Sequence, residues 1–327
     1  MKKIFSLLAA LSLSSAISQE VQLVHSLSKK EAPAHLFDPS SPYRILQDAL
    51  WKKQISLRCI EKDNSPLYFS EKRKNSLPIK LQEYFTGKSS SIVFSENPND
   101  YLVFWNIPQD LSLKTLQKVP SDRMILFTFD PFTETPKELP SIFSKIYTWN
   151  DDLVDDKKYF KFYIPSLQSM KEPTLSFEEK RLCTHFLTTH KEVGTTSQST
   201  LSWFSSKNFQ TLPRSTKQDL DQYRFCVCIE PVCDLPGYIS EKIFTAFESG
   251  CIPIYLGASN IERYIPKSCF IDPKDFNSPE ELLLYLETMS HEDHLIMQEN
   301  IQTFLASKEA KVFSMEHFSK IFQESIE

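Results

Sequence analysis

Residues 223–272, YRFCVCIEPVCDLPGYISEKIFTAFESGCIPIYLGASNIERYIPKSCFID, hold the pattern that decides the fold. The runs 224–229 and 252–256 are short, apolar and rich in branched and aromatic residues, as expected of buried strands. Between them, Ser240 is a good N-cap for a helix over 241–249, and Gly250 is its expected C-cap. A strand followed by a helix and a second strand is typical of a parallel sheet.

The same alternation extends in both directions from this stretch. Upstream, we expect strands at 54–60, 101–107, 124–129, 145–149 and 182–188, with helices at 78–85, 111–119 and 177–180. Downstream, Ser278 caps a helix that holds 282–286, and Ser290 caps the next one. Residues 19–45 contain several prolines and are expected to be an irregular lead-in. The sequence therefore predicts an α/β protein.

Length and composition limit the alternatives. The chain has 327 residues, enough for two domains, and its 41% hydrophobic and 24% charged residues are ordinary for a globular protein. We expect a segment 1–18 outside the fold, an N-terminal α/β domain over 19–165 and a C-terminal one over 166–327. The net charge is -5 and neither end carries a basic block, which argues against nucleic acid as a partner.

The N-terminus has the features of a targeting segment. Lys2 and Lys3 precede an apolar stretch over 4–17, and Ala16 and Ser18 suit cleavage before Gln19. A cleaved signal peptide is the preferred interpretation and a short uncleaved membrane anchor the alternative, so the protein is expected to be exported or membrane-associated. The seven cysteines are an odd number and do not decide the compartment.

Residues suited to an anionic ligand gather at one expected helix start. Glu230 ends a strand, and Tyr238, Ser240, Glu241 and Lys242 surround the first turn of the next helix. Ligands of open α/β sheets bind at the carboxyl ends of strands, and a helix N-terminus carries free N–H groups and partial positive charge. The arrangement suits a diphosphate. The alternative is that Glu241 and Lys242 are ordinary solvated charges.

The order of residues in this stretch resembles the donor-binding signature of glycosyltransferase family ten, the α1,3/α1,4-fucosyltransferases. The matching positions are Tyr223, Arg224, Phe225, Ile229, Glu230, Tyr238, Ile239, Ser240, Glu241, Lys242, Pro253, Ile254, Tyr255, Gly257, Tyr264, Pro266, Ser268, Phe270 and Ile271. A weaker resemblance extends through 145–165 (KIYTWNDDLVDDKKYFKFYIP) and 177–183. The likeness covers the chain from about residue 50 onward.

The resemblance implies two facing Rossmann-like domains (the GT-B type) and a hexosyltransferase activity. It implies inverting transfer of fucose from GDP-fucose to a glycan hydroxyl, with no bound metal and no other cofactor. By position, Glu241 would hold the ribose, Lys242 the phosphates and Tyr238 the nucleotide, beside Ser240. Glu230 would sit near the sugar or the guanosine. A nucleotide sugar and a glycan or glycoconjugate are the implied partners.

Inversion needs a general base for the acceptor hydroxyl. The family has a glutamate after an apolar strand of the N-terminal domain, and the corresponding stretch here is 124–136, MILFTFDPFTETP. Asp130 is therefore the candidate base, and Glu134 is the alternative.

Two departures from the family pattern bear on function. Pro231 replaces an asparagine, and no arginine lies between Arg181 and Arg214 where the family places a diphosphate clamp. Lys191 is the cation in the expected region, and it lacks the bidentate geometry of arginine. These departures keep two alternatives open: a transferase that uses another nucleotide sugar, and an inactive exported relative that acts as a carbohydrate-binding or interaction protein.

Three other patterns favour structure over chemistry. Asp219 and Asp221 form an Asp-x-Asp pair, but they precede a strand where a metal site would need them at its carboxyl end. His291 to His294 resembles a metal-binding run, yet Ser290 with Asp293 reads as a capping box. Cys226, Cys228 and Cys233 are close in sequence, and buried cysteines more often act as small hydrophobic residues.

Overall fold

The computed structural model describes residues 19–25, 46, 49–50, 55–60, 66–67, 101–106, 120–129, 139–186, 203, 210–212 and 217–327. The chain divides into two compact units. The first contains Met1–Thr148, Val154–Phe160 and Ser319–Glu327. The second contains Trp149–Leu153 and Lys161–Phe318, so neither unit is one continuous piece of chain.

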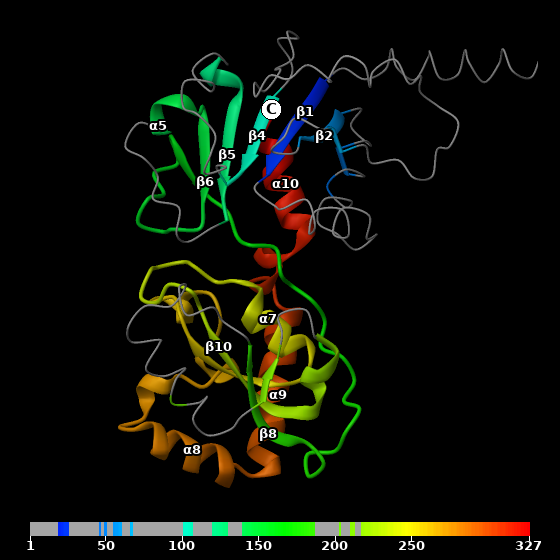
Figure 1. Ribbon diagram of the computed structural model, residues 1–327, viewed down its shortest axis with the longest axis vertical. Coiled ribbons are helices and arrows are strands. Elements are labelled where there is room, and N and C mark those ends of the chain that lie inside the picture. Colours follow the sequence, from blue (N-terminus) through cyan, green and yellow to red (C-terminus); the bar gives the residue numbers. More distant parts are fainter. Residues whose placement is uncertain are drawn as a thin grey trace, which may run out of the picture. The chain divides into compact units, whose positions relative to one another are not determined.

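The sheet of the first unit has seven strands in the order β3-β2-β1-β4-β5-β6-β7 (Figure 1). From β2 to β6 the neighbouring strands run parallel, and β3 is antiparallel to β2. The strands are β1 (Gln19–His25), β2 (Ile55–Ile60), β3 (Pro66–Leu67), β4 (Tyr101–Trp105), β5 (Met124–Thr128), β6 (Lys145–Thr148) and β7 (Tyr159–Lys161). The short helices η3 (Ser121–Arg123) and α5 (Leu139–Ile142) lie between them in the chain.

Aromatic packing fills the core of the first unit. Phe127 on β5 stacks on Tyr147 of β6, with ring centroids 4.5 Å apart, and on Phe322, with centroids 5.5 Å apart. Phe322 belongs to helix α10 (Met315–Ser325), whose residues from Ser319 onward are part of this unit. The end of the chain therefore packs against a sheet made almost entirely from its first half.

The expected strands of the first unit are confirmed within about two residues by β2, β4, β5 and β6. The expected irregular lead-in is wrong over Gln19–His25, because β1 pairs with both β2 and β4 inside the sheet and Val21 is completely buried. Glutamine and glutamate dilute the apolar pattern of this strand. The expected helices at 78–85 and 111–119 lie outside the described residues.

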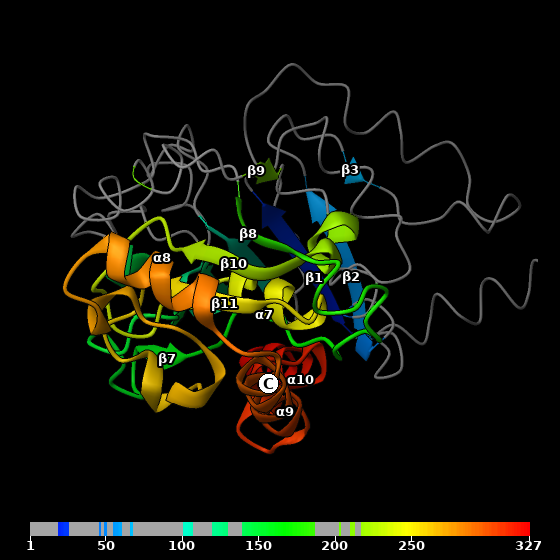
Figure 2. The same cartoon turned by 90° about the horizontal axis from the view of Figure 1, so that it is seen from below.

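The second unit has a parallel sheet in the order β11-β10-β8-β9, whose neighbouring strands β8, β10 and β11 can be followed in Figure 2. Helix α7 contacts β10 and β11. Its strands and α-helices are β8 (Arg181–Phe186), β9 (Gln210–Leu212), β10 (Tyr223–Ile229), α7 (Glu241–Glu248), β11 (Ile252–Leu256), α8 (Pro279–Thr288), α9 (His291–Ala306) and the start of α10. Its 3-10 helices are η5 (Lys217–Gln222), η6 (Ile261–Arg263), η7 (Lys267–Cys269), η8 (Pro273–Asp275) and η9 (Ala310–Phe313).

The expected N-caps of the second unit are confirmed. The hydroxyls of Ser240, Ser278 and Ser290 accept hydrogen bonds from backbone N–H groups in the first turns of α7, α8 and α9. At the other end of α7 the C-cap is Ser249, one residue before the expected glycine. Gly250 follows with a φ of 68°, the left-handed conformation that suits the residue after a C-cap.

Two further expectations have clear outcomes. The helical lead at 177–180 is wrong, because these residues form a turn with one i to i-4 bond before β8 begins, too short to nucleate a helix. The six cysteines from Cys183 to Cys269 are free, and Cys226 and Cys228 are buried in β10, as predicted for small hydrophobic residues. Among the described residues, no helix combines the length and the apolar character needed to cross a membrane.

His294 is a core residue of the second unit. Its ring meets Phe177 and Phe225 edge-on, with centroids 5.2 and 5.9 Å apart, and Nε2 lies 3.3 Å from the carbonyl of Arg224. Burial lowers the pKa of His294 from 6.5 to about 4. The fold therefore favours the neutral ring, and this contribution to stability is present above pH 6.5 and lost as the pH falls toward 4.

We expect the pH dependence of stability to follow from this residue. From pH 7 to pH 5, His294 should lower the free energy of unfolding by about 2 kcal/mol, as linkage requires for this pKa difference. Urea unfolding of His294→Gln, which cannot ionise, should show a pH dependence smaller by that amount. His291→Gln is the control, because that side chain is 50% exposed. Equal pH dependence in the parent and His294→Gln would contradict the prediction.

Candidate nucleotide-binding site

The predicted ligand-binding stretch follows β10 at the carboxyl edge of the second sheet. β10 ends at Ile229, and α7 begins at Glu241. We call residues 231–239 the β10–α7 loop. Because β8, β10 and β11 are parallel, their carboxyl ends meet at the edge where this loop leaves the sheet. The N-terminus of α7 therefore opens where α/β proteins hold their ligands.

Glu230 and Lys242 form a buried pair beneath this helix start. Glu230 is completely buried, and its Oε1 accepts a 2.8 Å hydrogen bond from the backbone N–H of Ser240. The Lys242 ammonium donates to the carbonyl of Ile229 at 2.5 Å and lies 3.9 Å from Glu230 Oε2. Burial raises the pKa of Glu230, opposed by the nearby Lys242 charge and the Ser240 N–H. The pair links the end of β10 to the first turn of α7.

The remaining predicted donor residues differ in exposure. Glu241 is exposed in the first turn, whereas Ser240 and Tyr238 are buried. Ser240 Oγ accepts from the backbone N–H of Lys242 at 3.3 Å, and the Tyr238 ring meets Trp149 edge-on with centroids 4.9 Å apart. Glu241 is therefore exposed, as the solvated-charge alternative expects, whereas Lys242 is buried and does not fit that alternative. Their roles toward a donor stay predictions.

A polar cluster that the sequence reasoning missed supports the β10–α7 loop. We call Asp151, Lys161, Asn260 and Tyr264 the Asp151 cluster. The Asp151 carboxylate accepts hydrogen bonds from the other three side chains. Asn260 Oδ1 in turn accepts from the backbone N–H of Gly237, at 2.8 Å. The sequence signals were weak: Asp151 lies in the stretch 145–165, and Tyr264 is one of the matched positions.

The candidate base and the candidate clamp lie outside the described residues. Asp130 comes two residues after β5, and the residue between them, Phe129, donates its backbone N–H to Asn106 Oδ1 at 2.6 Å. Asn106 has a φ of 57° and donates its own N–H to the carbonyl of Phe127. The chain therefore approaches Asp130 from a fixed strand end at the carboxyl edge of the first sheet. Asp130, its rival Glu134 and Lys191 stay predictions.

In the structure, the Asp-x-Asp pair is part of a short 3-10 helix. Asp221 lies in η5, ahead of β10, and accepts a 2.7 Å hydrogen bond from the Thr174 hydroxyl. Within the described part of the chain, no group of three or more His, Cys, Asp or Glu side chains is arranged to hold a metal ion.

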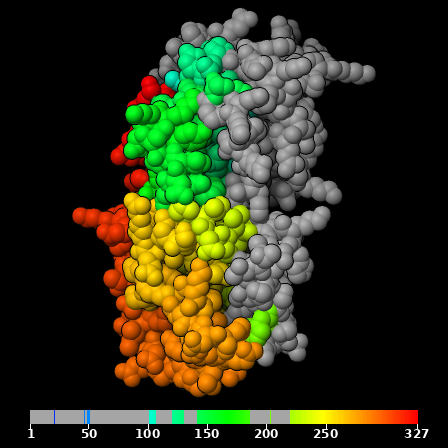
Figure 3. Space-filling view, turned by 90° about the vertical axis from the view of Figure 1, so that its left-hand side faces the viewer, coloured from blue at the N-terminus to red at the C-terminus, as the bar shows by residue number. Residues whose placement is uncertain are grey.

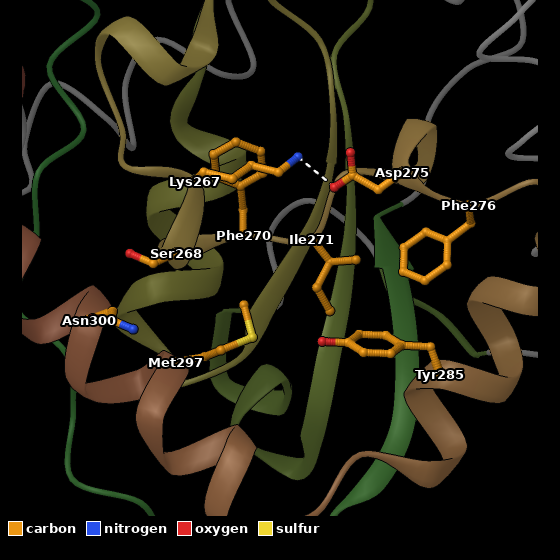
Figure 4. Close-up of a pocket in the computed structure, with 9 residues that line it drawn as sticks. All are labelled: Lys267, Ser268, Phe270, Ile271, Asp275, Phe276, Tyr285, Met297 and Asn300. Atoms are coloured by element: carbon orange, nitrogen blue, oxygen red, sulfur yellow. Dashed lines mark ion pairs between the residues drawn. The ribbon is translucent and has the colours of Figure 1, made fainter.

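A separate cavity of about 260 Å³ lies in the second unit (Figure 4). The Tyr285 hydroxyl and the Met297 side chain face its interior, and the ion pair between Lys267 and Asp275 crosses its rim at 2.7 Å. It shares no lining residue with the predicted donor site. Exposed apolar side chains occur on the same two helices, α8 and α9: Leu284, Tyr285, Leu295 and Ile296. The orange part of the surface in Figure 3 belongs to this stretch of the chain.

Solved structures with the same fold are glycosyltransferases. A crystal structure of an α1,3-fucosyltransferase aligns over 94% of this chain and 89% of that chain, with a TM-score of 0.53 and 13% identity. The structure of that enzyme type with GDP gives a TM-score of 0.51 over 94% and 90% of the two chains, also at 13% identity. A DNA-modifying β-glucosyltransferase gives 0.53 over 94% and 99%, again at 13% identity. The chain therefore has the GT-B glycosyltransferase fold, as predicted.

The sequence of the second unit is similar to proteins of one family. Residues 174–300 match the family model described as "Glycosyltransferase family 10 (fucosyltransferase) C-term". An α-(1,4)-fucosyltransferase from Arabidopsis thaliana is 37% identical over 70 residues, which is 21% of this chain and 17% of that protein. Mouse (Mus musculus) 4-galactosyl-N-acetylglucosaminide 3-α-L-fucosyltransferase 9 is 45% identical over 62 residues, or 18% and 17%. Residues 174–300 are thus similar to the C-terminal part of family 10, and the matches span about a sixth of these relatives.

Proposed function

We propose that this protein is a hexosyltransferase that moves fucose from GDP-fucose to a glycan hydroxyl with inversion. The observation that carries the proposal is the start of α7, where exposed Glu241 and buried Lys242 flank a helix N-terminus at the carboxyl edge of the second sheet. These residues lie inside the stretch that matches the family model. Two of the solved α1,3-fucosyltransferases with this fold are described with GDP and with GDP-fucose.

The first turn of α7 has the chemistry to hold a nucleotide diphosphate. Its backbone N–H groups and the helix dipole attract the phosphates, and the ammonium of Lys242 adds a full positive charge behind them. Glu241 accepts hydrogen bonds from ribose hydroxyls. As GDP departs, negative charge develops on the β-phosphate, and preorganised positive charge stabilises that transition state. Asp130 accepts the proton of the acceptor hydroxyl. No step requires a metal ion.

We expect GDP to bind without a divalent cation and to stabilise the protein. In the presence of EDTA, GDP at a hundred times its Kd should raise Tm by about 5 to 10 °C, because a ligand that binds only the folded state stabilises it by mass action. Thermal unfolding with GDP and with UDP measures the effect. A response to UDP and not to GDP would support a transferase for another nucleotide sugar.

A matched pair of glutamate-to-glutamine variants tests whether GDP binds at the start of α7. Glu241→Gln should weaken GDP binding by about 10-fold or more, the usual worth of charge-assisted hydrogen bonds. Glu292→Gln changes an exposed first-turn glutamate of α9 in the same way and should leave GDP affinity unchanged. If both variants change GDP affinity equally, the effect does not come from a contact at Glu241 and the site is misplaced. Specific binding of GDP without transfer to any glycan would favour the inactive relative, which Pro231 and Lys191 keep open.

We also propose that residues 1–18 direct the protein out of the cytoplasm, as a cleaved signal peptide or a short anchor. Support comes from Lys2 and Lys3 ahead of the apolar stretch and from Ala16 and Ser18 before Gln19. Mass spectrometry of the protein recovered from its native host should find Gln19 as the first residue. An intact Met1 in a membrane fraction would indicate the anchor, and an intact Met1 in the soluble fraction would refute both.

A further inference from the structure

We propose that Asp151 is a positioning residue for the β10–α7 loop, and so for the helix start that would receive the nucleotide. The loop contains Pro231 and Pro236, which donate no backbone hydrogen bond, and Gly237, whose N–H bonds to a side chain outside the loop. Its conformation near Tyr238 therefore depends on groups elsewhere in the chain. Those groups converge on Asp151. The consequence for nucleotide affinity rests on the proposed function, whereas the structural role does not.

The Asp151 carboxylate accepts three side-chain hydrogen bonds. Oδ1 accepts from the Lys161 ammonium at 2.6 Å, and Oδ2 accepts from Asn260 Nδ2 at 2.7 Å and from the Tyr264 hydroxyl at 2.5 Å. The side chains of Lys161 and Asp151 are 17% and 14% exposed. The hydrogen bonds together lower the pKa of Asp151 against the opposing effect of burial. Asp151 is thus an ionised acceptor for donors from two separate segments, Lys161 and residues 260–264.

The Asp151 carboxylate fixes the orientation of the Asn260 amide. Asn260 in turn holds the backbone of the β10–α7 loop. An ionised carboxylate only accepts hydrogen bonds, so the NH₂ group of Asn260 must face it. The carbonyl oxygen of the same amide then faces away and accepts the N–H of Gly237 at 2.8 Å. Asp151 also contacts the loop directly, because its backbone N–H donates to the carbonyl of Pro236 at 3.3 Å.

At Gly237, the β10–α7 loop packs tightly against Trp149, Asp151 and Lys161. Gly237 has a φ of 86°, and a Cβ there would lie 2.7 Å from Lys161 Nζ and 2.9 Å from Asp151 Cγ, and would also clash with the carbonyl oxygen of Trp149. The Lys161 ammonium donates to that carbonyl at 2.6 Å. The next residue, Tyr238, packs its ring on Trp149. Residues 149–151 therefore form the surface on which the loop turns into α7.

The test uses the full chain and compares two acid-to-amide changes. Asp151→Asn replaces one acceptor with a donor that faces other donors, so Asn260 loses its fixed orientation. In hydrogen exchange, the peptide covering 232–239 should exchange about 10-fold faster or more, as expected for a local opening, while α9 stays unchanged. GDP affinity should fall by about 10-fold. Asp234→Asn is the control, because this exposed acid of the same loop pairs only with exposed Lys274 among the ion pairs described.

A compensating pair distinguishes positioning from general support of the fold. In Asp151→Asn combined with Asn260→Asp, the carboxylate and amide exchange places, and the Gly237 N–H again faces a fixed acceptor. This variant should restore most of the protection of 232–239. Asn260→Ala should loosen the same peptide, because it removes the acceptor of the Gly237 N–H while Asp151 is kept, and it decides the question if Asp151→Asn does not fold.

Several outcomes would overturn the inference: unchanged exchange of 232–239 in Asp151→Asn, equal loosening by Asp234→Asn, faster exchange throughout the second unit, or no recovery in the paired variant. If Asp151→Asn does not fold, unchanged exchange of 232–239 in Asn260→Ala would overturn it. If the parent binds no GDP, the proposed function fails, and the exchange results still decide the role of Asp151.

Discussion

Asp130→Asn is expected to lower turnover by about 10²- to 10⁴-fold while GDP affinity stays at the parental value. Asparagine keeps the shape of the side chain and removes the basic oxygen that would accept the proton of the acceptor hydroxyl. The position suits this role because it follows β5, a central parallel strand whose end is fixed by the bond from Phe129 to Asn106. Initial rates of fucose transfer and calorimetry with GDP measure the two quantities.

Glu134→Gln is the matched control, because it makes the same chemical change four residues further along the chain. The substitution that abolishes transfer and spares GDP binding identifies the base. If both variants transfer fucose at the parental rate, the catalytic carboxylate lies elsewhere. If the parent binds GDP-fucose but neither transfers nor hydrolyses it, the protein is an inactive relative.

Glu230→Gln is expected to destabilise the protein by about 3 kcal/mol, because it leaves the buried ammonium of Lys242 without its anion. Glutamine still accepts the Ser240 N–H, so the loss reports the charge and not the missing hydrogen bond. Lys242→Met alone should also destabilise, since Glu230 then keeps a buried charge with no cation beside it. Urea unfolding at pH 7 measures each change in the free energy of unfolding.

The double variant Glu230→Gln with Lys242→Met tests the pairing itself. Removing both charges should recover at least half of the loss caused by Glu230→Gln, because no uncompensated charge stays buried. Strictly additive effects of the two single substitutions would show that the residues do not interact. GDP affinity of the double variant then separates the structural role of Lys242 from its proposed role toward phosphate.

The best-predicted part of the fold is the part whose signals are local. The N-cap at Ser240, the stripe of apolar residues in α7 and the two apolar strands on either side lie within about thirty residues, and each signal is visible in the sequence alone. β1 is the opposite case. Its place between β2 and β4 depends on pairing with strands 30 to 80 residues away, which its own mixed composition does not indicate.

The candidate site likewise combines residues that the sequence predicted with residues that it did not. The resemblance identified Glu230 and Lys242 by type and spacing, but a first-turn lysine is usually exposed, and the sequence does not show that this one turns inward to Ile229. The Asp151 cluster was missed because its members come from separate parts of the chain. No single window of sequence contains the carboxylate and the donors that surround it.

Because the second unit is not one continuous piece of chain, fragments and chimeras of this protein must include residues upstream of Lys161. A fragment that covers only residues 174–300 would encode Asn260 and Tyr264 without the carboxylate that orients them, since Asp151 and Lys161 lie upstream. Starting the fragment at Lys161 would still omit Trp149–Leu153. A chimera that takes its second unit from another protein of this fold must therefore import the matching 149–161 stretch with it, or the graft will have a loosened β10–α7 loop even where every signature residue is present.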